Sequence, residues 1–365
     1  MLEKDEAMKP LGIGLIGCGM VTQHLHIPAL GQLGDRFAVR ALYDASPSVR
    51  GQLAARMPGA MAHDSIGALL DNPEVDAVLV ASPSALHAPH AIAAMRAARH
   101  VLIEKPMCMT LPEADALAAA AQETGMIAQI GYMRRHAQAF HEAKRLIAAG
   151  GAEINMARLR AIIGPNSAFL KPTAAIIEGD DIPPESLAEA AEANALATRA
   201  VAGTTEGPRA FVHMLLLGLS THDISVMRGL IGMPARVLSA RHRRDGRFLT
   251  VDFDYGDFIC HFETGIDRIA RFDASMEVLS DERVIRLDYD TPFVRHLPAT
   301  LRVTEAEGES GVKETFHQPM RQDAFVAEWA SFHAAITEGA AIDTDIADAR
   351  QDLLLIENIM AVLAS

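Results

Sequence analysis

The stretch Val101-Leu102-Ile103-Glu104-Lys105-Pro106 is a short apolar run that ends in two opposite charges and a proline. An uninterrupted apolar run of this length is typical of a strand covered on both faces. Proline cannot donate a hydrogen bond to a neighbouring strand, so the strand is expected to stop before it. Glu104 and Lys105 would then lie at a carboxyl end, the edge of an open parallel sheet where ligands bind. The alternative is a surface ion pair, which is common and nearly neutral in energy.

Length and composition are those of an ordinary globular protein. The chain has 365 residues, half of them hydrophobic and 22% charged, and about 150 residues per domain suggests two domains. The net charge of −14 disfavours binding to nucleic acid or an anionic membrane. The charged residues 1–10 and the glycine-broken run behind them fit neither a signal peptide nor a membrane span. We expect a cytoplasmic protein with reduced thiols, because the widely spaced cysteines match no disulfide framework or zinc site.

A glycine turn follows the first expected strand, residues 11–16. Its sequence, Gly17-Cys18-Gly19-Met20-Val21-Thr22, approximates G-x-G-x-x-G with threonine in the third glycine position,. Gly17 would allow the tight turn, and Gly19 would let a pyrophosphate approach the N-terminus of a helix. A second strand, residues 38–43, closes with Asp44, near the expected spacing for an acid that binds the adenosine ribose. The alternative is a helix-packing turn and an aspartate that caps the next helix.

Strands and helices continue to alternate up to residue 131, in the expected ranges 77–81, 84–98, 101–103, 112–125 and 127–131. Such alternation predicts βαβ units and a parallel sheet. Ser82 and Pro83 end one strand at the same edge as Lys105, and His87 follows near the start of a helix. A lone histidine in this position is more often a packing residue, and a ligand role for His87 is the second interpretation.

The glycine turn, Asp44, Ser82-Pro83 with His87, and Glu104-Lys105-Pro106 together resemble the glucose-fructose oxidoreductase, inositol dehydrogenase and MocA family of NAD(P)-dependent oxidoreductases. The similarity covers nearly the whole chain, and Glu-Lys-Pro is its most specific part. It implies an N-terminal Rossmann domain, residues 1–131, that binds a nicotinamide dinucleotide. It also implies that Lys105 touches both the substrate hydroxyl and the nicotinamide ribose. The cofactor-binding residues so expected are Gly17, Gly19, Met20, Val21, Asp44, Ser82, Pro83, His87, Glu104 and Lys105.

The periodicity changes after residue 131, where strand-like segments follow one another. Asp245-Gly246 and Gly256-Asp257 are typical hairpin turns between them,. Strands are expected at 153–163, 237–243, 248–255, 258–263, 268–276, 282–289, 301–304 and 312–316, and helices at 137–149, 323–338 and 345–363. The resemblance implies that residues 132–365 form an α+β domain with an open-faced, mostly antiparallel sheet. One side of that sheet would meet the active site, and the other commonly makes oligomers.

Assembly can also be predicted from the strands themselves. Residues 248–255 and 258–263 carry large side chains on both alternations, which suggests a second apolar sheet face that must be buried. We therefore expect a homo-oligomer, a dimer or tetramer.

The helix expected at 323–338 carries an apolar stripe, which we interpret as core with no cofactor role. Its residues are Phe325, Trp329, Phe332 and Ile336,.

The alanine- and acid-rich stretch between Pro165 and Pro208 is longer than a plain connection, so it is either a functional insertion or lid or a solvated acidic face,. A helix is expected from about residue 185 to residue 200. Asp180 and Asp181 could suggest a metal, but nothing nearby completes a ligand set. We expect no metal.

A second chemical element is Ser220-Thr221-His222-Asp223-Ile224, which we expect to open a helix. The family usually places an aspartate and a histidine four residues apart here, with the histidine near the reacting hydroxyl. His222 matches the histidine, but Gly218 stands at the aspartate position. Asp223 points elsewhere on a helix and is no obvious substitute. The alternative for His222 is a structural role.

The resemblance, with these residues in place, implies reversible hydride transfer between a nicotinamide dinucleotide and a secondary hydroxyl of a sugar, cyclitol or related polyol. The expected catalytic residues are Lys105 and His222, and Tyr132, Arg134 and Arg158 are further candidates for substrate binding. Asp44 repels an extra phosphate, and Ala45 and Ser46 supply no cation, which favours NAD over NADP. The alternatives are a non-catalytic dinucleotide-binding regulator of the same fold and an enzyme acting on a non-sugar carbonyl or diol.

Overall fold

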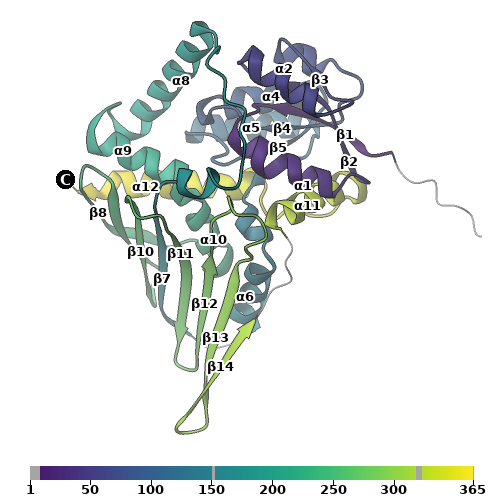
Figure 1. The fold of residues 1–365 in the computed structure, drawn as a ribbon. Helices are drawn as coiled ribbons and strands as arrows, with labels where there is room; N and C mark the ends of the chain where they lie inside the picture. Colours follow the sequence, from purple (N-terminus) through teal and green to yellow (C-terminus); the bar gives the residue numbers. More distant parts are fainter. Residues whose placement is uncertain (1–8, 150–152, 318–322, 365) are drawn as a thin grey trace, which may run out of the picture.

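The first part of the chain alternates strands and helices, as the sequence predicts. The computed structural model describes residues 9–149, 153–317 and 323–364. The elements up to residue 131 are β1 (Leu11–Ile16), η1 (Thr22–His26), α1 (Ile27–Gln32), β2 (Phe37–Tyr43), α2 (Pro47–Arg56), β3 (Met61–Ala62), α3 (Ile66–Leu70), β4 (Ala77–Val80), η2 (Ser84–Leu86), α4 (His87–Arg96), β5 (His100–Glu104), α5 (Leu111–Thr124) and β6 (Ala128–Gly131). The six strands form one parallel sheet in the order β3-β2-β1-β4-β5-β6 (Figure 1). This is the strand order of a Rossmann fold.

Both faces of this sheet are covered, which explains the continuous apolar runs in its strands. On β4, Val78 and Val80 lie in the core shared with α4 and α5, whereas Leu79 lies in the core shared with α1. Helix α5 begins with a capping box, in which Thr110 and Glu113 satisfy each other's backbone N–H groups, and it ends at Gly125 with φ of 68°,. Because these strands are parallel, the carboxyl ends of β1, β2, β4 and β5 meet at one edge of the sheet.

The second part begins with η3 and builds a second sheet. Its elements are η3 (Met133–His136), α6 (Gln138–Ala149), β7 (Ile154–Ile163), α7 (Ser167–Leu170), α8 (Pro184–Ala202), α9 (Gly207–Leu215), η4 (Leu216–Ser220), α10 (Thr221–Ile231), β8 (Arg236–Arg243), β9 (Phe248–Asp254), β10 (Ile259–Ile266), β11 (Phe272–Ser280), β12 (Arg283–Tyr289), β13 (Thr300–Glu307), β14 (Gly311–His317), α11 (Ala324–Glu338), α12 (Ile346–Val362) and β15 (Leu363–Ala364).

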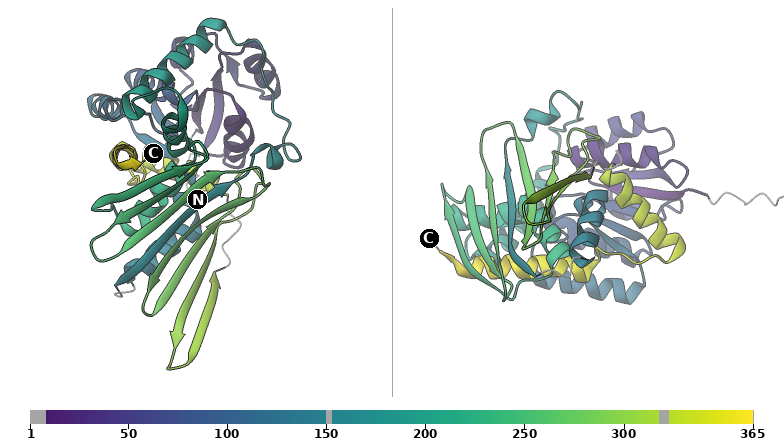
Figure 2. Two further views of the ribbon diagram at one scale, coloured as in Figure 1. Left: turned by 90° about the vertical axis from the view of Figure 1, so that its left-hand side faces the viewer. Right: turned by 90° about the horizontal axis from the view of Figure 1, so that it is seen from below.

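The second sheet has the strand order β14-β13-β12-β11-β7-β10-β9-β8-β15. Within the described part of this second sheet, only the β7–β10 and β8–β15 pairs are parallel. Helices α6, α10 and α12 pack on one side and leave the other side open (Figure 2). The predicted fold class, a Rossmann domain followed by an α+β domain with an open-faced and mostly antiparallel sheet, is confirmed.

The open face of the second sheet is mostly polar, and the expectation of a second apolar face is wrong. On β9 the inward side chains Leu249, Val251 and Phe253 are buried, whereas the outward alternation includes Thr250 and Asp252. The outward residues of β10 include His261 and Glu263, and His261 pairs with Asp252 at 2.7 Å. The alternation is thus that of a half-buried antiparallel sheet.

The helix that carries His222 begins earlier than predicted. Elements α9, η4 and α10 form one continuous helix from Gly207 to Ile231, so Ser220 lies inside it. By length and composition alone this helix could cross a membrane, with a mean hydropathy of 1.3. However, 78% of its most apolar window is buried inside the protein, as in the core helix of a folded domain.

The apolar stripe on α11 belongs to the core of the first sheet. Phe325, Trp329 and Phe332 are buried together with Leu25 and Phe37, which agrees with the predicted core role. A helix from the far end of the chain therefore completes one face of the N-terminal sheet. The exact domain division at residues 131 and 132 stays a prediction.

Candidate active site at the edge of the first sheet

The glycine turn after β1 has the shape that a bound phosphate needs. Gly17 has φ of +90°, and a Cβ there would lie 2.4 Å from the carbonyl oxygen of Ala81, so only glycine fits. A Cβ on Gly19 would meet nothing within 4 Å. Thr22, in the third glycine position, donates its hydroxyl to the carbonyl of Gly17 at 2.7 Å and holds the turn. The open side of Gly19 at a helix N-terminus fits the close approach of a dinucleotide pyrophosphate.

Asp44 follows β2 and is fixed by backbone groups. Its two carboxylate oxygens accept hydrogen bonds from the N–H of Cys18 at 2.8 Å and the N–H of Ser46 at 2.9 Å. The nearby Arg50 donates to the backbone carbonyl of Asp44 and pairs with the carboxylate of Asp64, each at 2.9 Å. The carboxylate of Asp44 is therefore tied to the glycine turn, in the place where an adenosine ribose is bound in this fold.

Glu104, at the end of β5, is buried and held on both oxygens. The Nε2 atom of His26 lies 2.8 Å from one oxygen, and the backbone N–H of Lys105 donates to the other at 2.9 Å. Trp329 donates its indole N–H to Nδ1 of His26 at 3.0 Å, so the proton of the neutral ring lies on Nε2 and points at Glu104. Burial raises the pKa of Glu104, but the hydrogen bond from His26 and the charge of Lys105 outweigh it and bring the pKa below its usual value,.

Lys105 reaches across from the first sheet to the long helix. Its Nζ donates to the backbone carbonyl of Gly218 at 2.7 Å, and the side chain is partly buried. Burial is the largest influence on its pKa, which lies below the ordinary value of lysine; Glu104 and Asp223 oppose the shift and Arg134 adds to it,. The site therefore favours a neutral amine more than bulk water does.

Together with Lys105, His222 on α10 lines one cavity, which is described below. No described side chain orients the ring of His222. Its Nδ1 atom is buried and has no hydrogen-bond partner among the described residues. Burial, with Lys105 and Arg134 nearby, lowers the pKa of His222 well below the usual value, so the ring is neutral at pH 7. The glycine at position 218 leaves no carboxylate to fix its tautomer.

Arg134 and Asp223 form a buried ion pair beside these two residues; their side chains are 3% and 2% exposed. The guanidinium also lies over the rings of Phe272 and Tyr289, 5.5 Å and 5.0 Å from their centroids,. Arg134 thus lies at the predicted site, but its charge is already compensated. The other oxygen of Asp223 has no partner among the described residues.

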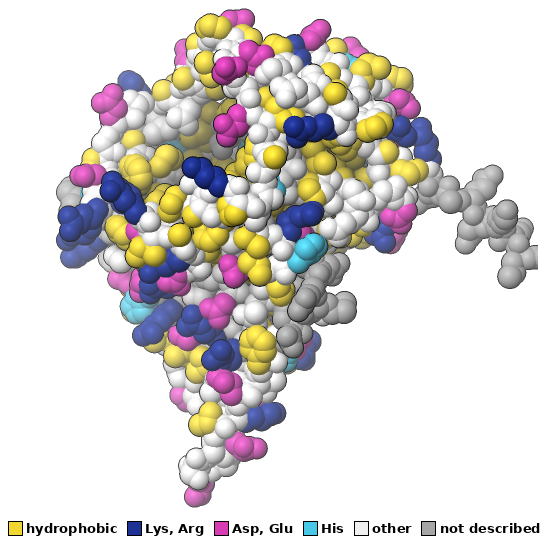
Figure 3. All heavy atoms as spheres, in the orientation of Figure 1, with side chains coloured by type: hydrophobic (Ala, Val, Ile, Leu, Met, Phe, Trp, Pro, Cys, Tyr) yellow, Lys and Arg dark blue, Asp and Glu magenta, His cyan; other side chains and the backbone are white. Residues whose placement is uncertain are grey.

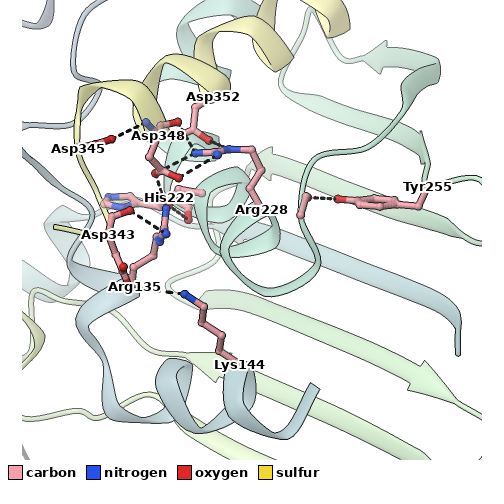
Figure 4. A network of polar contacts seen from close by, with 11 residues as sticks. Arg135, Lys144, His222, Arg228, Tyr255, Asp343, Asp345, Asp348 and Asp352 are labelled. Carbon is pink, nitrogen blue, oxygen red and sulfur yellow. Dashed lines mark hydrogen bonds and ion pairs between the residues drawn. The ribbon is translucent and has the colours of Figure 1, made fainter. Parts of the chain in front are cut away.

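A second set of ion pairs holds η3 and α10 to α12 (Figure 4). Arg228 binds Asp352 at 2.6 Å and Asp348 at 3.2 Å, and Arg135 also pairs with Asp348. Tyr132 hydrogen-bonds Asp352, and burial raises its pKa well above the ordinary value. The side chain of Tyr132 therefore belongs to this interhelical network and is not among the residues that line the cavity described below, and its substrate-binding role stays a prediction.

Arg158 lies away from the site, and His87 takes the packing role that the sequence favoured. Arg158 is exposed on the open face of β7, while its neighbours Ala157 and Leu159 face the helices, so it lies on the wrong side of the sheet for the site. The two ring nitrogens of His87 lie 2.7 Å from the carbonyls of Pro106 and Ser82. His87 is therefore a structural link between the ends of β4 and β5, with no ring nitrogen left for a cofactor.

A cavity of about 270 Å³ joins the two parts of the chain at this edge. Figure 3 shows hydrophobic side chains gathered around a hollow of the surface on the face of the molecule below α8. The cavity lining is mostly apolar, with Met214, Leu219 and Phe272 among its members. Its polar side chains are Glu104, Lys105, Arg134, Asn166 and His222.

The structure therefore brings Val21, Glu104, Lys105, Arg134 and His222 to one cavity. The remaining cofactor candidates, Gly17, Gly19, Met20, Asp44, Ser82 and Pro83, lie along the same sheet edge. Ser82 uses its hydroxyl to bind Nδ1 of His90 at 2.8 Å. The binding roles of all these residues stay predictions.

Sequence reasoning missed three participants: His26, Trp329 and the pairing of Asp223 with Arg134. The partners are 78, 303 and 89 residues apart in the chain, so no local pattern could have revealed them. Among the described residues, no group of three or more histidine, cysteine, aspartate or glutamate side chains could hold a metal.

Comparison with known proteins agrees with this architecture. Residues 11–132 match an oxidoreductase family with an NAD-binding Rossmann fold. The family is named after glucose-fructose oxidoreductase, inositol dehydrogenase and MocA. Inositol 2-dehydrogenase 2 of Saccharopolyspora erythraea is 28% identical over 343 residues, which cover 90% of this chain and 85% of the relative.

Two further comparisons widen the range of relatives. The 1-carboxy-3-chloro-3,4-dihydroxycyclohexa-1,5-diene dehydrogenase of Comamonas testosteroni is 34% identical over 138 residues, 38% of this chain and 34% of the relative. The solved structure of KijD10, a 3-ketoreductase from Actinomadura kijaniata in complex with NADP and TDP-benzene, has a TM-score of 0.73 at 20% identity and covers 97% of this chain and 98% of that chain. At this identity the likeness shows the fold alone. Residues 11–132 thus match the oxidoreductase family with an NAD-binding Rossmann fold, and the chain as a whole is similar to an inositol 2-dehydrogenase.

Proposed function

We propose that this protein is an NAD-dependent dehydrogenase that moves a hydride reversibly between the dinucleotide and a secondary hydroxyl of a sugar, cyclitol or related polyol. The observation that supports this most is the placement of Lys105 and His222 in one cavity, next to the edge of a Rossmann sheet. The likeness to an inositol 2-dehydrogenase over most of both chains supports the substrate class.

The dinucleotide supplies the hydride acceptor, and the chain must place the carbon and manage the hydroxyl proton. The Nζ atom of Lys105 is the group best suited to this proton, because burial lowers its pKa and a neutral amine can accept it. The carbonyl of Gly218 holds Nζ in place at 2.7 Å. His222 is neutral and can accept or donate one hydrogen bond to the substrate,.

The preference for NAD over NADP follows from the end of β2. The carboxylate of Asp44 can accept hydrogen bonds from ribose hydroxyls and repels an added phosphate. Arg50, the first cation after Asp44 in the sequence, is turned toward Asp64. KijD10, which shares this fold, was solved with NADP, whereas the matching family is described as NAD-binding, so the preference must come from residues near the adenosine ribose such as Asp44.

The apolar lining of the cavity favours a second candidate, a cyclic diol or deoxygenated sugar with fewer hydroxyls than inositol. Glu104 and Arg134 already have partners, so few polar side chains remain to satisfy a fully hydroxylated ring. The partial likeness to the dihydroxycyclohexadiene dehydrogenase agrees with such a substrate.

Nicotinamide absorbance, followed with both cofactors against matched substrates, tests the proposal. The panel would pair inositols and aldoses with cyclohexanediols, dihydroxycyclohexadienes and deoxy sugars. Turnover with NAD on any of these supports a dehydrogenase, and the better of each pair selects between the two candidates. Tight dinucleotide binding with no turnover across the panel would favour the non-catalytic regulator, and a higher kcat/KM with NADP would overturn the cofactor preference.

We also propose a cytoplasmic homo-oligomer, a dimer or tetramer that forms through the open face of the second sheet. That face carries ion pairs such as Arg160 with Asp273 at 2.8 Å, so an interface there would be largely polar. Light scattering at micromolar concentration should give a multiple of the chain mass, and a monomeric mass would remove the idea.

A further inference from the structure

The insertion between β7 and α9 crosses the cofactor side of the first sheet. Residues 177–181, called the strap below, connect α7 to α8 and run in front of the first sheet (Figure 1). One end meets the glycine turn: the side-chain amide of Gln23 bonds both the N–H and the carbonyl of Ile177, at 2.9 Å and 3.0 Å, and the carbonyl of Cys18 at 2.7 Å. The strap is therefore attached to the turn expected to hold the pyrophosphate.

The other end of the strap meets the residues that follow Asp44. The carboxylate of Asp181 accepts hydrogen bonds from the hydroxyl of Ser46, from the N–H of Ser48 at 2.8 Å and from the hydroxyl of Ser48 at 2.9 Å. Ser46 is the N-cap of α2. The backbone N–H of the same serine donates to Asp44. Ser46 is therefore bound by two carboxylates, Asp44 at its N–H and Asp181 at its hydroxyl.

The close fit of the strap shows that this contact is part of the fold. A Cβ on Gly179 would lie 2.0 Å from the hydroxyl oxygen of Ser46 and 2.6 Å from its Cβ, so a side chain at Gly179 would force the strap away. Ile177 is buried in the core that also contains Val49 of α2. Beyond the strap, α8 packs against η2, which follows β4 at the same sheet edge.

We propose that Asp181 is a second cofactor-selecting residue, whose carboxylate occupies the N-terminus of α2 where an adenosine 2′-phosphate would have to bind. This inference rests on the proposed use of NAD and deepens it. A phosphate on the ribose held by Asp44 would carry about −1.5 to −2 charges and would need donors from the residues after β2. The hydroxyl of Ser46 and both donors of Ser48 are already bound to Asp181, and Arg50 is bound to Asp64.

The hydrogen bonds that Asp181 accepts from Ser46 and Ser48 also lower its pKa, so the group is charged at neutral pH. An incoming phosphate would therefore meet two negative charges, and Arg50, the cation in the first half of α2, is already paired with Asp64. The 2′-hydroxyl of NAD carries no charge and adds no comparable repulsion. In this arrangement the second part of the chain, and not only the Rossmann sheet, selects the cofactor.

The test is a fluorescence titration of NADH and NADPH with the full chain and three variants. Asp181→Asn keeps the shape and one acceptor oxygen but removes the charge, and it should tighten NADPH binding by about tenfold while the Kd of NADH changes less than about twofold. Asp180→Asn is the matched control, because Asp180 is exposed and makes no described hydrogen bond or ion pair. It should leave both constants unchanged, and Asp44→Asn should weaken NADH binding.

The outcomes separate the inference from the proposed function. If the unmodified protein prefers NADH but Asp181→Asn leaves the ratio of the two constants unchanged, the role of Asp181 is wrong and Asp44 alone selects. If the unmodified protein prefers NADPH, the proposed NAD preference fails, while a further gain for NADPH in Asp181→Asn would still support the local role of Asp181. An equal effect of Asp180→Asn would reduce the finding to general surface charge.

Discussion

The cofactor side and the substrate side of the site are held by different interactions. On the cofactor side, backbone groups fix the side chains: Asp44 accepts hydrogen bonds from two N–H groups, the ring of His87 lies between two carbonyls, and Lys105 donates to the carbonyl of Gly218. On the substrate side, buried ion pairs between distant segments do this work, with Arg134–Asp223 and Arg228–Asp352 as the main examples. Backbone-held groups can be encoded by short motifs, whereas the ion pairs need the assembled fold.

The largest effect is expected from breaking the substrate-side framework. Asp223→Ala would leave the guanidinium of Arg134 buried without its counter-charge, which costs about 3–5 kcal/mol of unfolding free energy. Urea denaturation of the unmodified protein and of Asp223→Ala measures the difference in unfolding free energy. The exposed pair of Arg302 and Glu314, at 3.5 Å, supplies the control: Glu314→Ala should cost less than about 1 kcal/mol. Equal losses in the two variants would contradict the contrast between buried and exposed pairs.

This contrast also explains what the sequence could predict. Five of the six strands of the first sheet and the locations of Asp44 and Lys105 follow from local apolar runs, the glycine turn and the Glu-Lys-Pro motif. The sixth, β3, is two exposed residues, Met61–Ala62, and has no such pattern. The role of Asp223 could not be predicted, because its partner Arg134 lies 89 residues away. The local pattern alone suggested that Asp223 points elsewhere on the helix than His222 and is no obvious substitute for the aspartate missing at Gly218.

Two of the predicted substrate-binding residues, Arg158 and Tyr132, lie outside the cavity for physical reasons. Arg158 lies on a strand in which neighbouring residues face opposite sides, and the sequence did not show which alternation of β7 faces the helices. Tyr132 is two residues from Arg134, but it stands at the start of the short helix η3 and points to Asp352. In each case a difference of one or two positions moves a side chain out of the cavity.

The next effect in size concerns Lys105. We expect Lys105→Ala to lower kcat by about 10²-fold or more, the scale of lost acid–base catalysis, while the Kd of NAD changes little. Lys105→Arg is the sharper variant, because arginine keeps the positive charge but cannot become a neutral base; its turnover should also be lost. Lys9→Ala, an exposed lysine outside the site, serves as control. Near-normal turnover by Lys105→Ala would sink the assignment of the Glu-Lys-Pro motif as the catalytic centre.

The kcat/KM for alcohol oxidation is expected to change with pH in a defined direction. Burial lowers the pKa of Lys105, and alcohol oxidation needs the neutral amine, so kcat/KM for oxidation should rise with pH and level off above that pKa. The midpoint should lie below about 10.4, the value of an ordinary lysine. A pH profile that falls through this range, or one that is the same in Lys105→Ala, would show that another group carries the proton.

The smallest effect is expected from His222, and it addresses the difference between the two sides most directly. Neither the backbone nor an ion pair holds this ring: its Nδ1 atom has no partner among the described residues. A histidine of undefined tautomer contributes little, so His222→Ala should lower kcat by about tenfold, less than Lys105→Ala.

Gly218 offers a way to orient the ring of His222, because a Cβ at position 218 would meet nothing within 4 Å. An aspartate at position 218, four residues before His222 on the same helix, could fix the ring through a hydrogen bond. In a Gly218→Asp background the loss caused by His222→Ala should therefore grow, and a double-mutant cycle on kcat measures the coupling. Zero coupling, or a loss in the single variant as large as that of Lys105→Ala, would show that His222 is already oriented.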